Sequence, residues 1–153
     1  MRRDMKKRTN NLLGIGNMKP VIQEEITGCA IASAAAIAGM TYSETKKIAN
    51  SIGIYAEDSK LWSETNYIRN LLAKLGIEAA NIELAFDTWE SVPDLALLST
   101  KWHMEKGKAY WHWVVFVREE SESYILDSKK SLKTNKRTDF GRIKPKWFIE
   151  VKV

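Results

Sequence analysis

The chain has 153 residues, of which 44% are hydrophobic and 28% charged, and its formal net charge is +5. This length suffices for one domain with its own core, and the composition excludes a disordered, collagen-like or disulfide-rich chain. A single cysteine excludes an intrachain disulfide, and the longest apolar run, residues 30–40, is too short to span a bilayer. Because no apolar signal segment follows the basic N-terminus, we expect a cytoplasmic protein.

The positive charge is concentrated at the two ends. Residues 1–8 carry a net charge of +4 and residues 129–153 one of +7, whereas the segment between them carries −6. Basic ends of this kind are able to contact an anionic partner. No aromatic interleaving or binding motif accompanies them, so we interpret them as solvated and expect no specific nucleic-acid partner. Residues 1–17 precede a second methionine, Met18, and are expected to form a disordered arm, with 18–153 as a single domain.

Three helices are predicted in the first half of this domain. An Ala-rich apolar run from Cys29 to Met40 indicates a buried helix. Capping-box spacing predicts a second helix over about residues 42–51. Ser63 is the expected cap of a third helix, which ends at Gly76. The apolar positions of the third helix, at helical spacing, are Ile68, Leu71, Leu72 and Leu75.

Short apolar stretches follow the third helix and are typical of strands. They cover residues 77–84, 95–102, 110–117, 124–127 and 147–153. The dipeptide Lys106-Gly107 marks a turn between two of these stretches. Helices followed by strands predict an α+β domain, with N-terminal helices packed on a C-terminal antiparallel sheet.

Cys29 is the only thiol of the chain and stands where its helix is expected to begin. A cysteine attacks as the thiolate, and the N–H groups at a helix N-terminus stabilise that anion. A buried cysteine among alanines is also commonly a small core residue. Gln23, six residues upstream, favours the catalytic interpretation, because its amide and the N–H of Cys29 together offer two donors to an oxyanion. The alternative is that Gln23 is an ordinary loop residue facing solvent.

His112 lies in an apolar strand whose two faces are both hydrophobic. An imidazole in such a strand needs a partner, which is either a backbone carbonyl of the core or a functional group. Asp127 ends the next apolar stretch, which a turn brings alongside, so its carboxylate is placed to orient the imidazole. His103 is the only rival base, and its charged neighbours indicate a turn residue instead.

In combination, these residues resemble the site of the papain-like cysteine peptidases, above all the branch of the bacteriocin-leader (double-glycine) processing peptidases and their stand-alone bacterial relatives. The shared features are a Gln six residues before the Cys, an apolar helix starting at the Cys, and a His followed 15 residues later by an Asp across a hairpin. The resemblance covers about residues 18–128 and implies a papain-like fold. By this resemblance Cys29 is the nucleophile and His112 the general base and then acid. Asp127 would orient the imidazole, and Gln23 would donate to the oxyanion.

The sequence also departs from that family. Ala30 stands where these peptidases commonly have glycine, and the spacing from cysteine to histidine is much shorter than in the plant and lysosomal enzymes. The expected activity is hydrolysis of a peptide or other amide bond of a peptide or protein substrate, through an acyl-thioester. No metal or organic cofactor is expected, since one cysteine and two histidines do not readily build a zinc site. Two alternatives stay open: a catalytically silent papain-like binding module, and a transglutaminase-like acyltransferase with the same triad.

Overall fold

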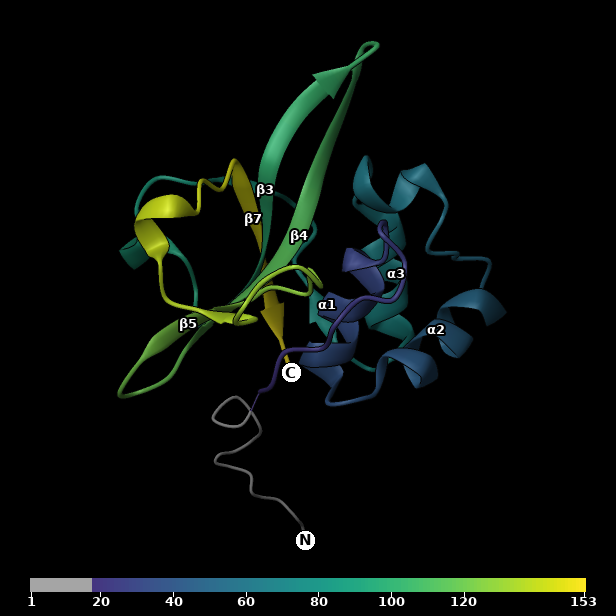
Figure 1. Cartoon of the computed structure of the whole chain (residues 1–153), viewed down its shortest axis with the longest axis horizontal. Coiled ribbons are helices and arrows are strands. Elements are labelled where there is room, and N and C mark those ends of the chain that lie inside the picture. Colours follow the sequence, from purple (N-terminus) through teal and green to yellow (C-terminus); the bar gives the residue numbers. More distant parts are fainter. Residues whose placement is uncertain (1–17) are drawn as a thin grey trace, which may run out of the picture.

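The computed structural model describes residues 18–153, so the arm predicted over residues 1–17 lies outside the described residues. Helices come first in the chain and strands second, and the helices gather on one side of the sheet (Figure 1). The α+β prediction is therefore confirmed. In the described part of the chain, no helix is both long and apolar enough to cross a membrane. The helical elements are α1 (Cys29–Ala38), α2 (Tyr42–Ser51), the 3-10 helix η3 (Ser59–Trp62) and α3 (Asn66–Lys74).

The helix boundaries follow from local capping. α1 begins after Gly28 and ends at Gly39, whose left-handed φ of 70° stops it two residues before the predicted end. The predicted capping box of α2 is present, with Thr41 and Glu44 bonded reciprocally. The prediction that Ser63 caps the third helix is wrong. Ser63 instead ends η3, and α3 begins three residues later.

All strand pairs are antiparallel and form one seven-stranded sheet, in the order β1-β7-β3-β4-β5-β6 with β2 also paired to β7. The strand predicted over residues 77–84 is present only near its two ends, because the chain pairs with β7 at Glu78–Ala79 and Leu84–Ala85 and does not pair between them. β6 is short and basic, so no apolar pattern predicted it. The strands are β1 (Glu78–Ala79), β2 (Leu84–Ala85), β3 (Leu95–Glu105), β4 (Lys108–Arg118), β5 (Ser123–Leu126), β6 (Lys136–Arg137) and β7 (Trp147–Lys152).

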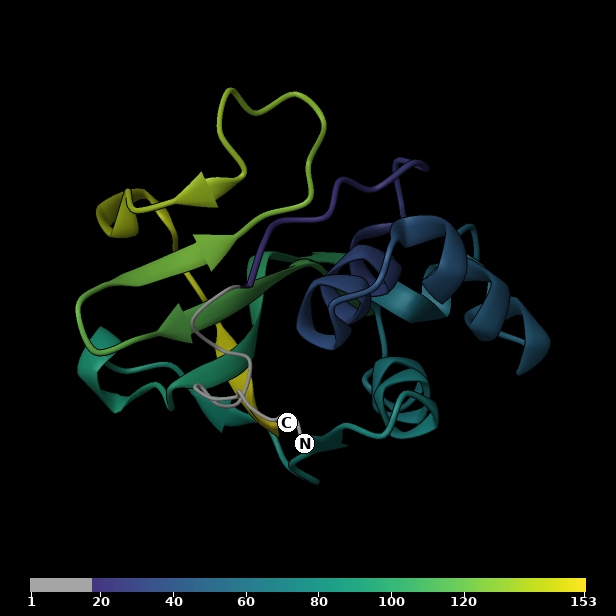
Figure 2. The same ribbon diagram turned by 90° about the horizontal axis from the view of Figure 1, so that it is seen from below.

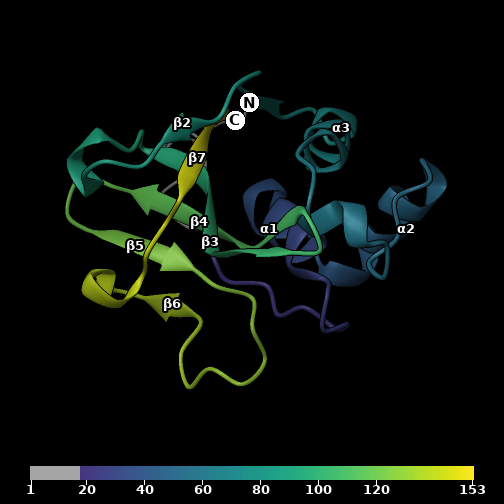
Figure 3. The ribbon, with the colours of Figure 1, turned by 90° about the horizontal axis from the view of Figure 1, so that it is seen from above.

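The core lies on both faces of the sheet. α1 packs between β4 and the other helices, so that it is buried along almost its whole length (Figure 3). Trp113 and Val115 of β4 face this helical side. Val114 and Phe116 belong to a second apolar cluster on the outer face. Both faces of β4 are thus buried, as its sequence predicted. The outer cluster is covered by the segments that carry Phe86, Trp89 and Phe140.

β3 and β4 form a long hairpin that extends beyond the rest of the sheet (Figure 1). Its turn is Lys106-Gly107, as predicted, and both residues have positive φ, of 50° and 81°, which suits a two-residue hairpin turn. The prediction that His103 is a turn residue is wrong, since it lies within β3, paired with Tyr110. The pairing register of β3 shifts between Thr100 and His103, which separates the outer part of the hairpin from the sheet.

Candidate active site

Cys29 is the first residue of α1, and its side chain is only 4% exposed. The N–H of Trp113 donates to its sulfur at 3.5 Å, so the thiol lies against the middle of β4. The first N–H groups of a helix have no partner within the helix, and they face any group placed at its N-terminus. Both features place backbone N–H donors next to the sulfur.

The loop before α1 forms hydrogen bonds to α2 and to the segment that follows α2. The carboxylate of Glu25 accepts hydrogen bonds from the Tyr42 hydroxyl and the Lys46 ammonium. The hydroxyl of Thr27 donates to the carbonyl of Ala56 at 2.7 Å. A methyl group on Gly28 would lie 2.3 Å from the Tyr42 oxygen, so only glycine fits there. The segment that leads into Cys29 is therefore held by side-chain contacts at Glu25, Thr27 and Gly28.

His112 and Asp127 meet across β4 and β5. The register that pairs Val115 with Leu126 makes them diagonal neighbours. Nε2 of His112 lies 2.8 Å from Oδ1 of Asp127, and their side chains are 15% and 2% exposed. Because the carboxylate is ionised, Nε2 carries the proton and donates it, and the ring also lies within hydrogen-bonding reach of the Cys29 side chain.

The pKa values of this pair move in opposite directions. Burial opposes protonation of His112, yet its hydrogen bonds to Asp127 and Cys29 outweigh burial and raise the pKa of His112 to about 9. Burial likewise opposes ionisation of Asp127, but the bonds from His112 and Arg137 lower the pKa of Asp127 to about 2. Near neutral pH the site therefore holds a carboxylate beside an imidazolium, which is the charge arrangement that supports a thiolate.

Three residues that sequence reasoning missed also hold Asp127, and one of them, Arg137, binds the carboxylate oxygen that the ring does not contact. Nη1 of Arg137 donates to Oδ2 at 2.9 Å, while Nε and Nη2 of the same guanidinium bind Asp139. The N–H of Lys129 donates to Oδ1 at 3.2 Å. The amide of Asn135 closes the loop by donating to the carbonyl of Asp127. The sequence showed only that Arg137 belongs to the basic C-terminal segment, and this position does not predict which residue it contacts.

Gln23 is buried, with 5% exposure, and not a solvent-facing loop residue. Its Nε2 donates to the carbonyls of Glu25 and Ile26 at 3.0 and 2.6 Å, and its Oε1 accepts from the Ser128 hydroxyl at 2.7 Å. Its backbone N–H also donates to the carbonyl of Ser128, which joins this segment to the loop after β5 (Figure 2). In this conformation both hydrogens of the side-chain amide are donated to backbone carbonyls of the loop. The role of oxyanion donor stays a prediction.

His103 lies apart from this cluster, on the exposed outer part of β3. Its ring contacts the carbonyl of Lys101 and the carboxylate of Glu105, both at 2.9 Å. These bonds raise the pKa of His103, the larger effect coming from the Lys101 carbonyl. Nothing connects this ring to the thiol.

A cavity of about 290 Å³ opens beside His112, between the loop before α1 and the loop after β5. Its walls include Gln23 and Ile26 on one side and Lys101 and Lys129 on the other. Over residues 18–153 there is no group of three His, Cys, Asp or Glu side chains arranged to hold a metal ion. The wall of the cavity is of mixed charge, because Glu24 and Glu25 line it together with the lysines.

Comparison by sequence gave no match to a protein-family model and none to a curated protein. Comparison by structure finds a likeness to the crystal structure of a double-glycine motif protease from an AMS/PCAT transporter, in complex with the leader peptide. The TM-score is 0.58 and the identity 14%, over 88% of this chain and 91% of that one. The predicted papain-like α+β fold is confirmed, and the relationship to double-glycine proteases is a distant one of fold.

Proposed function

We propose that this protein is a cysteine-dependent hydrolase that cleaves a peptide or other amide bond through an acyl-thioester. The observation that carries the proposal is the connected set Cys29–His112–Asp127, assembled from a helix N-terminus and two neighbouring strands. The known activity of the structural neighbour, a protease seen with a leader peptide, agrees with a peptide substrate.

The reaction follows from this geometry. The Cys29 thiolate attacks the carbonyl carbon, and the oxygen takes up the electron pair as an oxyanion next to the N–H of Cys29. Collapse of this intermediate breaks the C–N bond, and His112 passes its proton to the departing amine. His112 then removes a proton from water, which attacks the thioester carbonyl; the C–S bond breaks, a carboxylic acid leaves, and the Cys29 thiolate is restored beside the protonated ring. Asp127 keeps the ring oriented and stabilises its protonated form throughout.

Labelling with iodoacetamide followed by mass spectrometry tests the nucleophile directly, because Cys29 is the only thiol. We expect the folded protein to react faster than free cysteine at about pH 6, where an ordinary thiol is almost fully protonated. His112→Ala should reduce the rate by about tenfold or more, whereas His103→Ala, the matched control, should not change it. A folded thiol no more reactive than free cysteine would leave the silent binding module as the better interpretation.

Turnover separates a hydrolase from an acyltransferase. A library of internally quenched peptides should yield cleavage products that Cys29→Ala does not form. Adding an amine at high concentration should leave a hydrolase forming mostly free acid, while an acyltransferase would form mostly the amide. Formation of amide as the main product at low amine concentration would contradict the hydrolase proposal.

A further inference from the structure

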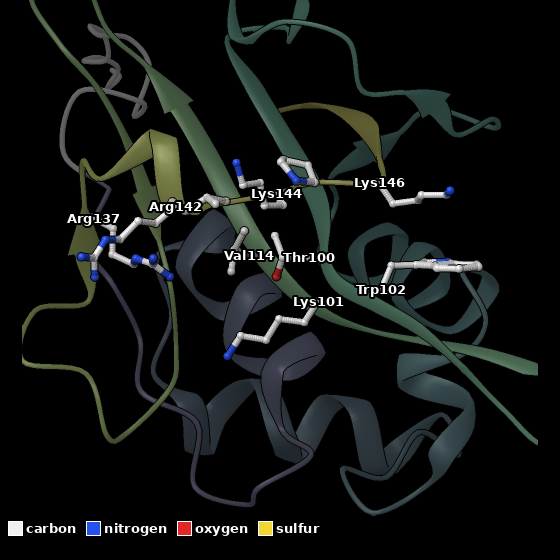
Figure 4. Close-up of a pocket in the computed structure, with 10 residues that line it drawn as sticks. Thr100, Lys101, Trp102, Val114, Arg137, Arg142, Lys144 and Lys146 are labelled. Carbon is white, nitrogen blue, oxygen red and sulfur yellow. The ribbon is translucent and has the colours of Figure 1, made fainter.

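The basic C-terminal segment surrounds a second cavity, of about 450 Å³, on the outer face of the sheet. Arg137 and Arg142 gather at one end of this cavity, and Lys146 lies beside Trp102 at the other (Figure 4). No acidic residue is among those that line it, over the described part of the chain. Its five cationic lining residues are Lys101, Arg137, Arg142, Lys144 and Lys146.

Two of these cations already have partners. Arg137 binds Asp127 and Asp139, and the ammonium of Lys146 lies 4.8 Å from the centroid of the Trp102 ring. The other three, Lys101, Arg142 and Lys144, are exposed and form no ion pair within residues 18–153. We call these three residues the basic channel. Like charges around one cavity repel one another, and an anion between them would relieve that repulsion.

Lys101 connects the basic channel to the candidate active site. It lines both cavities, so the second cavity and the one beside His112 lie next to each other with Lys101 as their common wall. Its backbone has a left-handed φ of 53°, at the register shift between Thr100 and His103, which sets it apart from the regular strand. Partial burial of its ammonium group and then the neighbouring Lys129 ammonium lower the pKa of Lys101, so two cations stand close together at the junction.

We propose that the basic channel binds an acidic stretch of the peptide substrate while the scissile bond lies at Cys29. This inference rests on the proposed hydrolase function, and it adds a charge preference to it. A peptide is favoured over nucleic acid because the only aromatic ring lining the cavity in the described residues, Trp102, has Lys146 over one face. The channel therefore lacks the row of aromatic rings on which successive bases of a single strand stack.

Binding to the full-length Cys29→Ala variant tests the channel without turnover. The probes are fluorescein-labelled peptides about ten residues long, of alternating Glu and Gly or alternating Gln and Gly, read by fluorescence anisotropy. We expect the Glu peptide to bind about tenfold or more tightly than the Gln peptide, and to weaken strongly between about 50 and about 300 mM NaCl. Equal binding of both peptides would overturn the proposal, as would tighter binding of an oligo-dT of equal charge.

Charge reversal locates the binding surface. Arg142→Glu with Lys144→Glu should weaken binding of the Glu peptide by about tenfold or more. The matched control, Lys47→Glu with Lys74→Glu, makes the same charge change at exposed positions of α2 and α3 and should alter binding less than about twofold. An equal effect of both double variants would show only long-range attraction and would overturn the site.

The two proposals fail in different ways. In the native chain, iodoacetamide labelling of Cys29 tests the nucleophile by itself, since that probe is small and uncharged and has no need of the basic channel. If the thiol is reactive but binding shows no charge preference, the proposal for the basic channel is wrong and the hydrolase proposal stands. If the thiol is inert but binding depends on charge, the hydrolase proposal is wrong, and so is the proposal that the basic channel binds a substrate.

Discussion

Arg137 donates from Nη1 to Oδ2 of Asp127 at 2.9 Å, the carboxylate oxygen that His112 leaves free. The guanidinium is in turn held by two bonds to Asp139, at 2.9 and 2.7 Å. The Arg137 side chain is 18% exposed and that of Asp127 only 2%, so this ion pair is screened little by water. The imidazole, the carboxylate and the guanidinium thus form one line of alternating charge across β4, β5 and β6.

Arg137→Gln should raise the pKa of Asp127, because one of the two cations that hold the carboxylate ionised is removed. The acid limb of iodoacetamide labelling should then move to higher pH, and the rate at about pH 4 should fall more than the rate at about pH 7. Arg137→Lys should recover part of the loss, since it keeps the charge. Arg142→Gln is the control and should leave the limb in place; an equal loss at every pH would make Arg137 merely structural.

The stability of the protein should depend on pH through His112. Its folded pKa of about 9 exceeds the unfolded value of about 6.5, so its contribution is complete below about pH 6.5 and is lost as pH rises through about 9. The free energy of unfolding in urea should fall by up to about 3 kcal/mol over that range. His112→Gln should remove most of this slope, whereas His103→Gln should keep it. A slope unchanged in His112→Gln would show that the ring is not held as an imidazolium.

Gly28→Ala should destabilise the protein by about 1–3 kcal/mol, because the added methyl meets the buried Tyr42 hydroxyl. Gly141→Ala is a matched control, since nothing lies within 4 Å of the position its methyl would take. Tyr42→Phe removes the clashing oxygen, so the double variant Gly28→Ala with Tyr42→Phe should be less destabilised than the two single changes predict when added. Strict additivity in urea unfolding would exclude this contact as the cause.

Comparing variants of Gln23 and Ser128 distinguishes an effect on catalysis from an effect on the stability of the loop. Both Gln23→Ala and Ser128→Ala break the bond between the two side chains and should lower the free energy of unfolding by about 1–3 kcal/mol. If the amide also stabilises the oxyanion, only Gln23→Ala should lower kcat by about a hundredfold, with KM little changed. Equal kinetic effects of the two variants would restrict Gln23 to holding the loop.

The sequence by itself determined the order of helices and strands and the meeting of His112 with Asp127. The periodicity of apolar residues predicts helices and strands, because it shows which faces are buried. A short connection between two strands allows few pairing registers, so the sequence spacing predicted that His112 and Asp127 would lie near each other across β4 and the end of β5. The capping box of α2 and the turn at Lys106-Gly107 were predictable for the same local reason.

Only the tertiary structure decided which polar groups complete the site. Arg137 reaches Asp127 from a two-residue strand with no apolar signature, and Gln23 is bonded to Ser128, 105 residues away. The same holds for Lys101, whose place at the junction of two cavities depends on a register shift in β3. Hydrogen bonds and charge pairs between distant segments depend on where the packed backbone places their donors and acceptors, and local sequence patterns carry no record of those positions.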